Sequence, residues 1–145
     1  DWSSDVCSSD LNITEHIILA PDHLKPHAGF SFKQFANKVI TRENIKTYFN
    51  VGNFKILLNA GNYILTRNIT EKMTFDEAIL PKITACDVIF FNLLAYQQYP
   101  DLQLHIVENM DYTHNVHSDS EYLKTHAVCD STLEKFVIPS YKKLL

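Results

Sequence analysis

The apolar run Phe54-Lys55-Ile56-Leu57-Leu58-Asn59 constrains the fold of this 145-residue chain more than any other segment. It is almost continuously hydrophobic, and the turn-forming residues Ala60-Gly61-Asn62 follow it directly. A strand that is covered on both faces shows such a run, because neither of its faces contacts water. We therefore expect residues 54–59 to form a central strand in a layered α/β domain.

The segments around this run alternate between strand-like and helix-like patterns. Strands are expected at residues 15–20 and 102–107, and helices at 31–40, 41–50, 74–85, 87–99, 120–128 and 132–144. We expect Pro21 to end the first strand and residues 22–29 to form a loop, in which His23 and His27 could border a site. This order of elements favours one α/β domain over residues 12–145, with a mostly parallel sheet in a three-layer α/β/α arrangement.

Local signals set the expected helix boundaries. Three pairs have the spacing of a capping box, in which a Ser or Thr is followed three residues later by Glu. Proline removes a backbone donor, so we expect Pro81 to kink or split the helix that contains it. The capping pairs are Thr74 with Glu77, Ser118 with Glu121, and Ser131 with Glu134.

A second topology fits the middle of the chain. Residues 54–58 and 63–67 could pair as antiparallel strands around the Ala60-Gly61-Asn62 turn. Together with the two helices expected before them, they would form a winged helix, which is a fold that binds nucleic acid. The long apolar helix and the strand that follow favour the layered α/β fold instead.

Residues 1–11 resemble, in every position, the translation of a common sequencing adapter. We therefore treat this segment as non-native and the remaining domain as incomplete at its N-terminus. Removing Asp1, Asp5 and Asp10 from a chain of net charge −4 leaves −1. This near-neutral remainder has no basic stripe for phosphate, so no nucleic-acid partner is expected.

Several further classes are excluded on composition. No apolar run approaches the roughly 20 residues of a membrane helix, so no membrane span is expected. The chain holds only three glycines, Gly29, Gly52 and Gly61, which excludes a P-loop or a dinucleotide fingerprint. No cofactor is expected, and the localisation stays open. Outside the adapter-like segment two cysteines remain, Cys86 and Cys129, which we expect to be reduced thiols.

Two groups of residues near the C-terminus carry possible chemistry. His114, His117, His126 and Cys129 have donor types that suit zinc, which makes a metal site a weak alternative to an ordinary polar loop. Asp111 and His114 follow the strand expected at 102–107, where ligands gather in open α/β sheets. An aspartate three residues before a histidine could orient that ring as a general base.

The segment from Ala28 to Val107 resembles the SGNH (GDSL-like) esterases and lipases. Gly29 before a helix matches the glycine of the family's second block, and residues 54–62 are similar to the strand and G-x-N-D motif of its third block. The resemblance implies a flavodoxin-like or SGNH-like sheet and an ester substrate of lipid or sugar type. It also implies that Gly29 and Asn62 donate to an oxyanion, while Asp111 and His114 serve as acid and base.

The chain departs from this family in three places. No Gly-Asp-Ser nucleophile block occurs, Tyr63 stands where the family has Asp, and the Asp111–His114 pair comes one βα unit early. We therefore expect an inactive fragment of an SGNH-like hydrolase or a non-catalytic relative. The alternatives are a binding module on an α/β scaffold, the C-terminal part of an α/β-hydrolase with His114 as base, and a winged-helix nucleic-acid binder.

Overall fold

The computed structural model of this chain describes residues 15–25, 31–59, 64–83, 86–113, 124 and 126–145. Its sheet has four strands, in the spatial order β2-β4-β1-β3. The strands are β1 (Ile17–Lys25), β2 (Val39–Thr41), β3 (Ile64–Leu65) and β4 (Gln103–Thr113). Only β1 and β4 run parallel, whereas β2 and β3 are short antiparallel strands at the two edges. The α/β class is confirmed, but the sheet is mixed and the prediction of a mostly parallel sheet was wrong.

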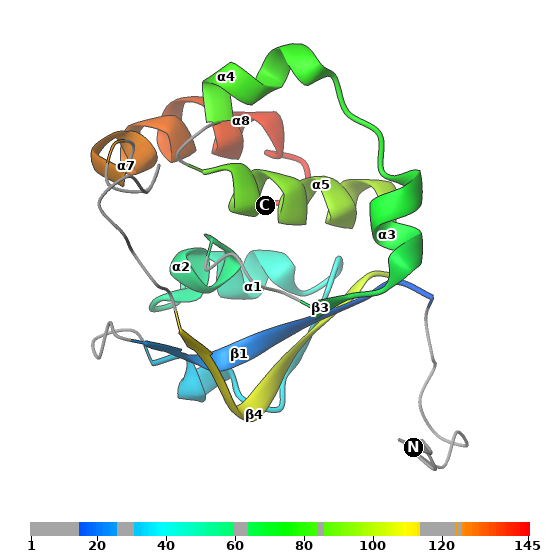
Figure 1. Cartoon of the computed structure of the whole chain (residues 1–145), viewed down its shortest axis with the longest axis vertical. Coiled ribbons are helices and arrows are strands. Elements are labelled where there is room, and N and C mark those ends of the chain that lie inside the picture. Colours follow the sequence, from blue (N-terminus) through cyan, green and yellow to red (C-terminus); the bar gives the residue numbers. More distant parts are fainter. Residues whose placement is uncertain (1–14, 26–30, 60–63, 84–85, 114–123, 125) are drawn as a thin grey trace.

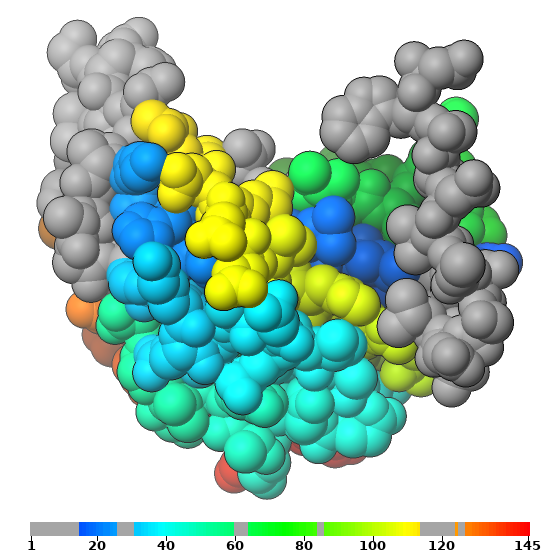
Figure 2. Space-filling view, turned by 90° about the horizontal axis from the view of Figure 1, so that it is seen from below, coloured from blue at the N-terminus to red at the C-terminus, as the bar shows by residue number. Residues whose placement is uncertain are grey.

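The α-helices of the described residues lie on one face of this sheet (Figure 1). Figure 2 looks at the opposite face, where β2, β4 and β1 follow one another in cyan, yellow and blue. The three-layer arrangement is therefore not confirmed. The helical elements are η1 (Lys33–Phe35), α1 (Ile45–Phe49), α2 (Phe54–Asn59), α3 (Arg67–Lys72), η2 (Glu77–Ile79), α4 (Leu80–Ile83), α5 (Asp87–Gln98), η3 (His126–Val128), α7 (Cys129–Thr132), η4 (Leu133–Val137) and α8 (Ile138–Ser140).

The expected central strand at residues 54–59 is helix α2, which is the largest correction to the sequence analysis. Phe54, Leu57 and Leu58 are all fully buried, and their spacing is that of one face of a helix. A short apolar run is compatible with both periods, so hydrophobicity alone does not separate a buried strand from a buried helix. This helix also removes the two-stranded wing that the winged-helix alternative required.

Residues 31–40 were expected to form a helix, but only the single turn η1 forms. Phe32 and Phe35 are buried at helical spacing, which is the pattern that suggested a longer helix. Asn37 ends the turn with a left-handed backbone, φ 61°, and short side chains of this type tolerate that conformation. The β-branched residues Val39, Ile40 and Thr41 then favour the strand β2.

Strand β1 does not stop at Pro21, as the sequence predicted, but continues to Lys25. β3 pairs with β1 only at Ile18 and Leu19, and the isolated bridge of Ser31 is with His23, so among the described residues Pro21 has no strand partner besides β4. A proline is tolerated in a strand where its missing N–H would have faced no partner. The residues after Pro21 therefore stay in the sheet.

Three further expected elements are confirmed in type, with shifted ends. α1 lies within the helix expected at 41–50, α5 matches the helix at 87–99, and β4 extends the strand at 102–107 to Thr113. Pro81 lies in the first turn of the short helix α4, where proline is favoured. Asp76, and not Thr74, caps the preceding turn η2, with its carboxylate accepting from Ala78 N.

The C-terminal helical segment begins at η3 and α7, earlier than the helix expected at 132–144, and Ser131 lies inside α7 and does not cap its start. Most of the helix expected at 120–128, including Ser118 and Glu121, falls outside the described residues.

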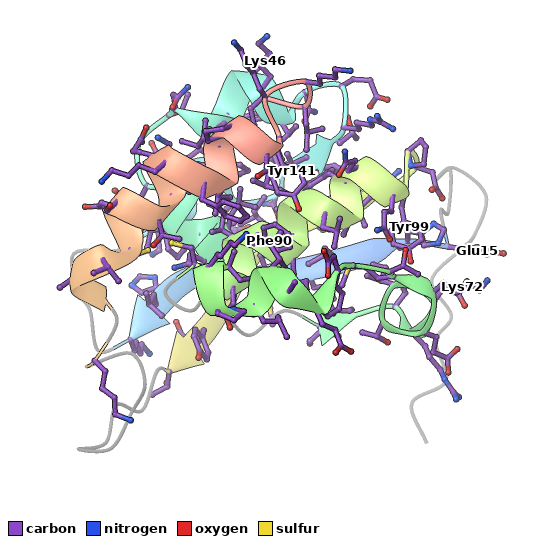
Figure 3. The ribbon with its side chains drawn as sticks, turned by 90° about the horizontal axis from the view of Figure 1, so that it is seen from above. Glu15, Lys46, Lys72, Phe90, Tyr99 and Tyr141 are labelled. Carbon is purple, nitrogen blue, oxygen red and sulfur yellow. The ribbon has the colours of Figure 1, made fainter. Side chains whose placement is uncertain are left out.

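Helix α5 forms the centre of the core, between the sheet and the C-terminal helices. Its Tyr96 is fully buried, and the hydroxyl donates to the carbonyl of Ile40 in β2 at 2.9 Å. On the far side of α5, the ring centroids of Phe90 and Tyr141 lie 5.4 Å apart, with the two rings tilted against each other (Figure 3). Because α5 is buried on both sides, it has no polar face. None of the helices in the described residues is long and apolar enough to cross a membrane.

Candidate functional site

The carboxyl ends of β1 and β4 lie at the same edge of the sheet, because these two strands are parallel. This edge is at the left of Figure 1, below α2 and α7. Ligands of open α/β sheets bind outside the carboxyl ends of the strands, where side chains of neighbouring strands converge. Side chains at this edge that do not contribute to packing or pairing are therefore candidates for a ligand site.

Asp22 in β1 is the most unusual of these groups. Its side chain is only 1% exposed, and no described residue donates a hydrogen bond to either carboxylate oxygen. Asp22 alternates along the strand with the buried residues Ala20 and Leu24, so it points to the helix-covered face. A buried polar group without a hydrogen-bond partner lowers the free energy of unfolding by about 1–3 kcal/mol. The carboxylate of Asp22 therefore destabilises the fold.

An irregularity in β4 sets the residues that lie beside this aspartate. His23 comes two positions after Pro21 in β1, whereas its partner Asp111 comes four positions after Val107 in β4. The additional residues form a bulge in which Asn109 has a left-handed φ of 61°. Because the bulge adds two residues, side-chain alternation is kept, and Asp111 lies opposite His23 where an unbroken register would place Asn109.

Asp111 pairs with Lys25, whose Nζ lies 2.6 Å from a carboxylate oxygen of the aspartate. The hydrogen bond from Lys25 lowers the pKa of Asp111, and the charges of Lys25, His23 and Lys33 lower it further. Lys33 lies in the turn η1, just after Ser31, which forms a bridge with His23. Lys25, Lys33 and His23 thus lie near the carboxylate of Asp111 on the outer side of this edge.

Asp111 was expected directly after a strand at 102–107, whereas it lies within β4, where it is paired with Lys25. Its expected partner, His114, lies outside the described residues, as do the expected oxyanion donors Gly29 and Asn62. These three assignments stay predictions. The strand on which the resemblance located Asn62 is the helix α2, so the structure supplies no independent reason for an oxyanion site there.

Of the four residues of the weak zinc alternative, the structure describes two. His126 lies in η3 and Cys129 begins α7, whereas His114 and His117 fall outside the described part of the chain. Among the described residues, no group of three or more metal-binding side chains occurs. The sulfur of Cys129 contacts the thiol of Cys86 at 2.9 Å and the side-chain amide of Asn59 at 3.8 Å.

Sequence reasoning missed Asp22, because Pro21 was taken to end the strand. The available signal was the alternation of Ile18, Ala20, Asp22 and Leu24, which continues the buried face of the strand past the proline. Aspartate is almost never fully buried without a partner. An aspartate in the buried register of a strand is therefore a site candidate.

The chain matches no family model, no curated protein and no solved structure.

Proposed function

We propose that this chain is a binding module on an α/β scaffold, with a site for a small polar molecule at the carboxyl ends of β1 and β4. The observation that carries this proposal is the carboxylate of Asp22, which is buried at this edge without a hydrogen-bond donor among the described residues. A buried polar group that lowers the stability of the fold is explained where a bound ligand supplies its missing hydrogen bonds.

The chemistry of the edge indicates the ligand class. A carboxylate accepts hydrogen bonds only, so Asp22 suits a ligand that presents hydroxyl groups. The outer side of the edge carries Lys25 and Lys33, whose ammonium groups suit an anionic group. Because Asp22 faces the helices and the lysines face outward, the ligand has to reach both faces around the ends of β1 and β4, and a small sugar that carries a phosphate offers one group to each.

Nitrogen-15 NMR titration of the full chain tests this proposal. Ribose 5-phosphate is the probe, and ribose and inorganic phosphate are the separate arms. We expect ribose 5-phosphate to shift the amide signals of residues 22–25 and 111–113 in the wild type. The matched variant Asp22→Asn keeps the shape of the side chain, and we expect it to weaken binding at least tenfold. Unchanged signals with all three probes would contradict the ligand class.

An SGNH-like ester hydrolase is the second candidate. It is favoured by the position of Asp111 at the end of β4, where the carboxylate stays ionised because Lys25 lowers its pKa. An ionised aspartate is the form that orients a catalytic histidine. The helix α2, in place of the expected strand, weakens the resemblance that suggested this activity.

The predicted pair of Asp111 and His114 can be tested without an active enzyme. A carboxylate beside a histidine raises the pKa of the ring, because it stabilises the imidazolium. If the two residues interact, Asp111→Asn lowers the pKa of His114, measured from its ring proton signals by NMR. The same pKa of His114 in the wild type and the variant would show that the two residues do not interact, which would contradict the hydrolase candidate.

A further inference from the structure

Cys86 and Cys129 form a thiol pair that joins two helices distant in sequence. Cys86 precedes the first turn of α5 and is fully buried, whereas Cys129 begins α7 and is partly exposed. Their sulfur atoms lie 2.9 Å apart, although 43 positions separate the residues. Both are free thiols. We propose that this pair is a redox site, which closes reversibly to a disulfide that ties the start of α5 to α7.

The surroundings of the two sulfur atoms differ, which sets the order of the reaction. Cys129 Sγ accepts from the side-chain amide of Asn59 at 3.8 Å and contacts the thiol of Cys86, which also donates to the backbone carbonyl of Cys129 at 3.0 Å. The hydrogen bond between the two thiols lowers the pKa of Cys129 and raises the pKa of Cys86. The thiolate is the nucleophile in disulfide exchange, so the partly exposed Cys129 reacts first and Cys86 second.

The reaction needs an oxidant, and a small disulfide such as oxidised glutathione fits the exposed sulfur. The Cys129 thiolate attacks one sulfur of glutathione disulfide and releases one glutathione thiolate, which leaves a mixed disulfide on Cys129. Cys86 then attacks the sulfur of Cys129, which releases the second glutathione thiolate, and this thiolate takes up the proton that Cys86 loses. Two protein thiols are oxidised, and one glutathione disulfide is reduced to two glutathione molecules.

Asn59 links the thiol pair to the end of α2. Its side-chain oxygen accepts from the backbone N–H of Ile89 at 3.2 Å, and its side-chain nitrogen donates to Cys129 Sγ. A disulfide sulfur is a poorer acceptor than a thiolate, so oxidation weakens one of these two contacts. We expect the amide signals of Asn59 and Ile89 to shift on oxidation, while those of the distant helix α3 stay in place.

Thiol counting tests the proposal directly. The background is the full chain with Cys7→Ser, which removes the one cysteine outside the pair. The protein is equilibrated with oxidised glutathione, alkylated under denaturing conditions and measured by intact mass. We expect no alkyl group and no glutathione after oxidation, and two alkyl groups after dithiothreitol. Two alkylated thiols after oxidation, persistent glutathione adducts, or disulfide-linked dimers would each overturn the proposal.

Two single-cysteine variants test the order of the steps. In Cys86→Ser, Cys129 has no second thiol to release glutathione, so we expect a stable mixed disulfide. In Cys129→Ser, the buried Cys86 should form this adduct at least roughly tenfold more slowly. Equal rates would overturn the order of attack. The thiol count of the background protein does not depend on whether these variants fold, and circular dichroism checks that they do.

Discussion

Lys25 and Asp111 join the carboxyl ends of two parallel strands, with Nζ of the lysine 2.6 Å from the carboxylate of the aspartate. Both side chains are about half exposed, 55% and 48%, so water and salt screen the pair. Because of the bulge in β4, Asp111 lies opposite His23, and Lys25 reaches it from two positions further along β1. The ion pair therefore adds little to stability, and its main effect is to keep the carboxylate of Asp111 ionised at this edge of the sheet.

The titration of Asp111 provides the first prediction. Lys25 lowers the pKa of Asp111, so we expect Lys25→Met to raise it toward the usual aspartate value. Because the folded-state pKa is depressed, the contribution of the pair to stability is present above the usual pKa and is lost as the pH falls through the lowered value. Carbon-13 NMR of the carboxyl group measures the pKa. An unchanged value in Lys25→Met would show that the pair does not form in solution.

The bulge in β4 depends on the backbone of Asn109. Its φ of 61° lies in the left-handed region, which disfavours side chains branched at Cβ. We expect Asn109→Val to lower the free energy of unfolding by about 1–2 kcal/mol. The control Asn109→Gly removes the same side chain but tolerates this backbone, so its stability should stay close to wild type. Denaturant unfolding measures the free energy of unfolding of both variants. An equal decrease in the two variants would contradict the left-handed backbone of Asn109 in this bulge.

A buried hydrogen bond connects α5 to the edge strand β2. Tyr96→Phe removes the hydroxyl that donates to Ile40 and leaves this carbonyl without that donor. We expect the free energy of unfolding to fall by about 1–3 kcal/mol. Tyr99→Phe serves as a comparison, because its hydroxyl donates to Ile69 over a longer distance of 3.3 Å. Chemical unfolding should rank Tyr96→Phe as the more destabilised of the two, and the reverse order would contradict this account of the core.

The fold was only partly predictable from the sequence, for physical reasons that differ between segments. Helix α5 and strand β4 were found because each is long enough for its period or its apolar alternation to be distinct. Helix α2 was mistaken for a strand because six residues span less than two turns, and buried faces look alike in both structures. Without that strand, the prediction of a mostly parallel sheet failed as well.

The candidate site was less predictable than the fold. Asp111 was selected because it follows the apolar part of a recognisable strand, near the place where α/β proteins bind ligands. The position of Asp111 opposite His23 depends on a bulge, and a bulge leaves no clear pattern in a single sequence. The contact of Cys86 with Cys129 spans 43 positions and depends on how α7 packs against α5. Spacing within a sequence carries no information on such a contact.

Oxidation of the thiol pair has a measurable effect on stability. A disulfide between Cys86 and Cys129 closes a loop across 43 positions and reduces the conformational freedom of the unfolded chain. We expect the oxidised protein to gain about 2–4 kcal/mol in free energy of unfolding over the reduced protein. Denaturant unfolding with and without dithiothreitol, in the Cys7→Ser background, measures the difference. A less stable oxidised form would indicate that the native packing does not accommodate the bond.

Thermal unfolding of the wild type and Asp22→Leu, with and without ribose 5-phosphate, tests the central claim most directly. Leucine keeps the branched outline of aspartate and removes the unpartnered carboxylate. Without the sugar phosphate, we predict that Asp22→Leu is the more stable protein, by about 1–3 kcal/mol. With it, we predict that only the wild type unfolds at a higher temperature, since only the wild type binds. A destabilised Asp22→Leu variant, or equal stabilisation of both proteins by the sugar phosphate, would contradict the assignment of Asp22 to a ligand site.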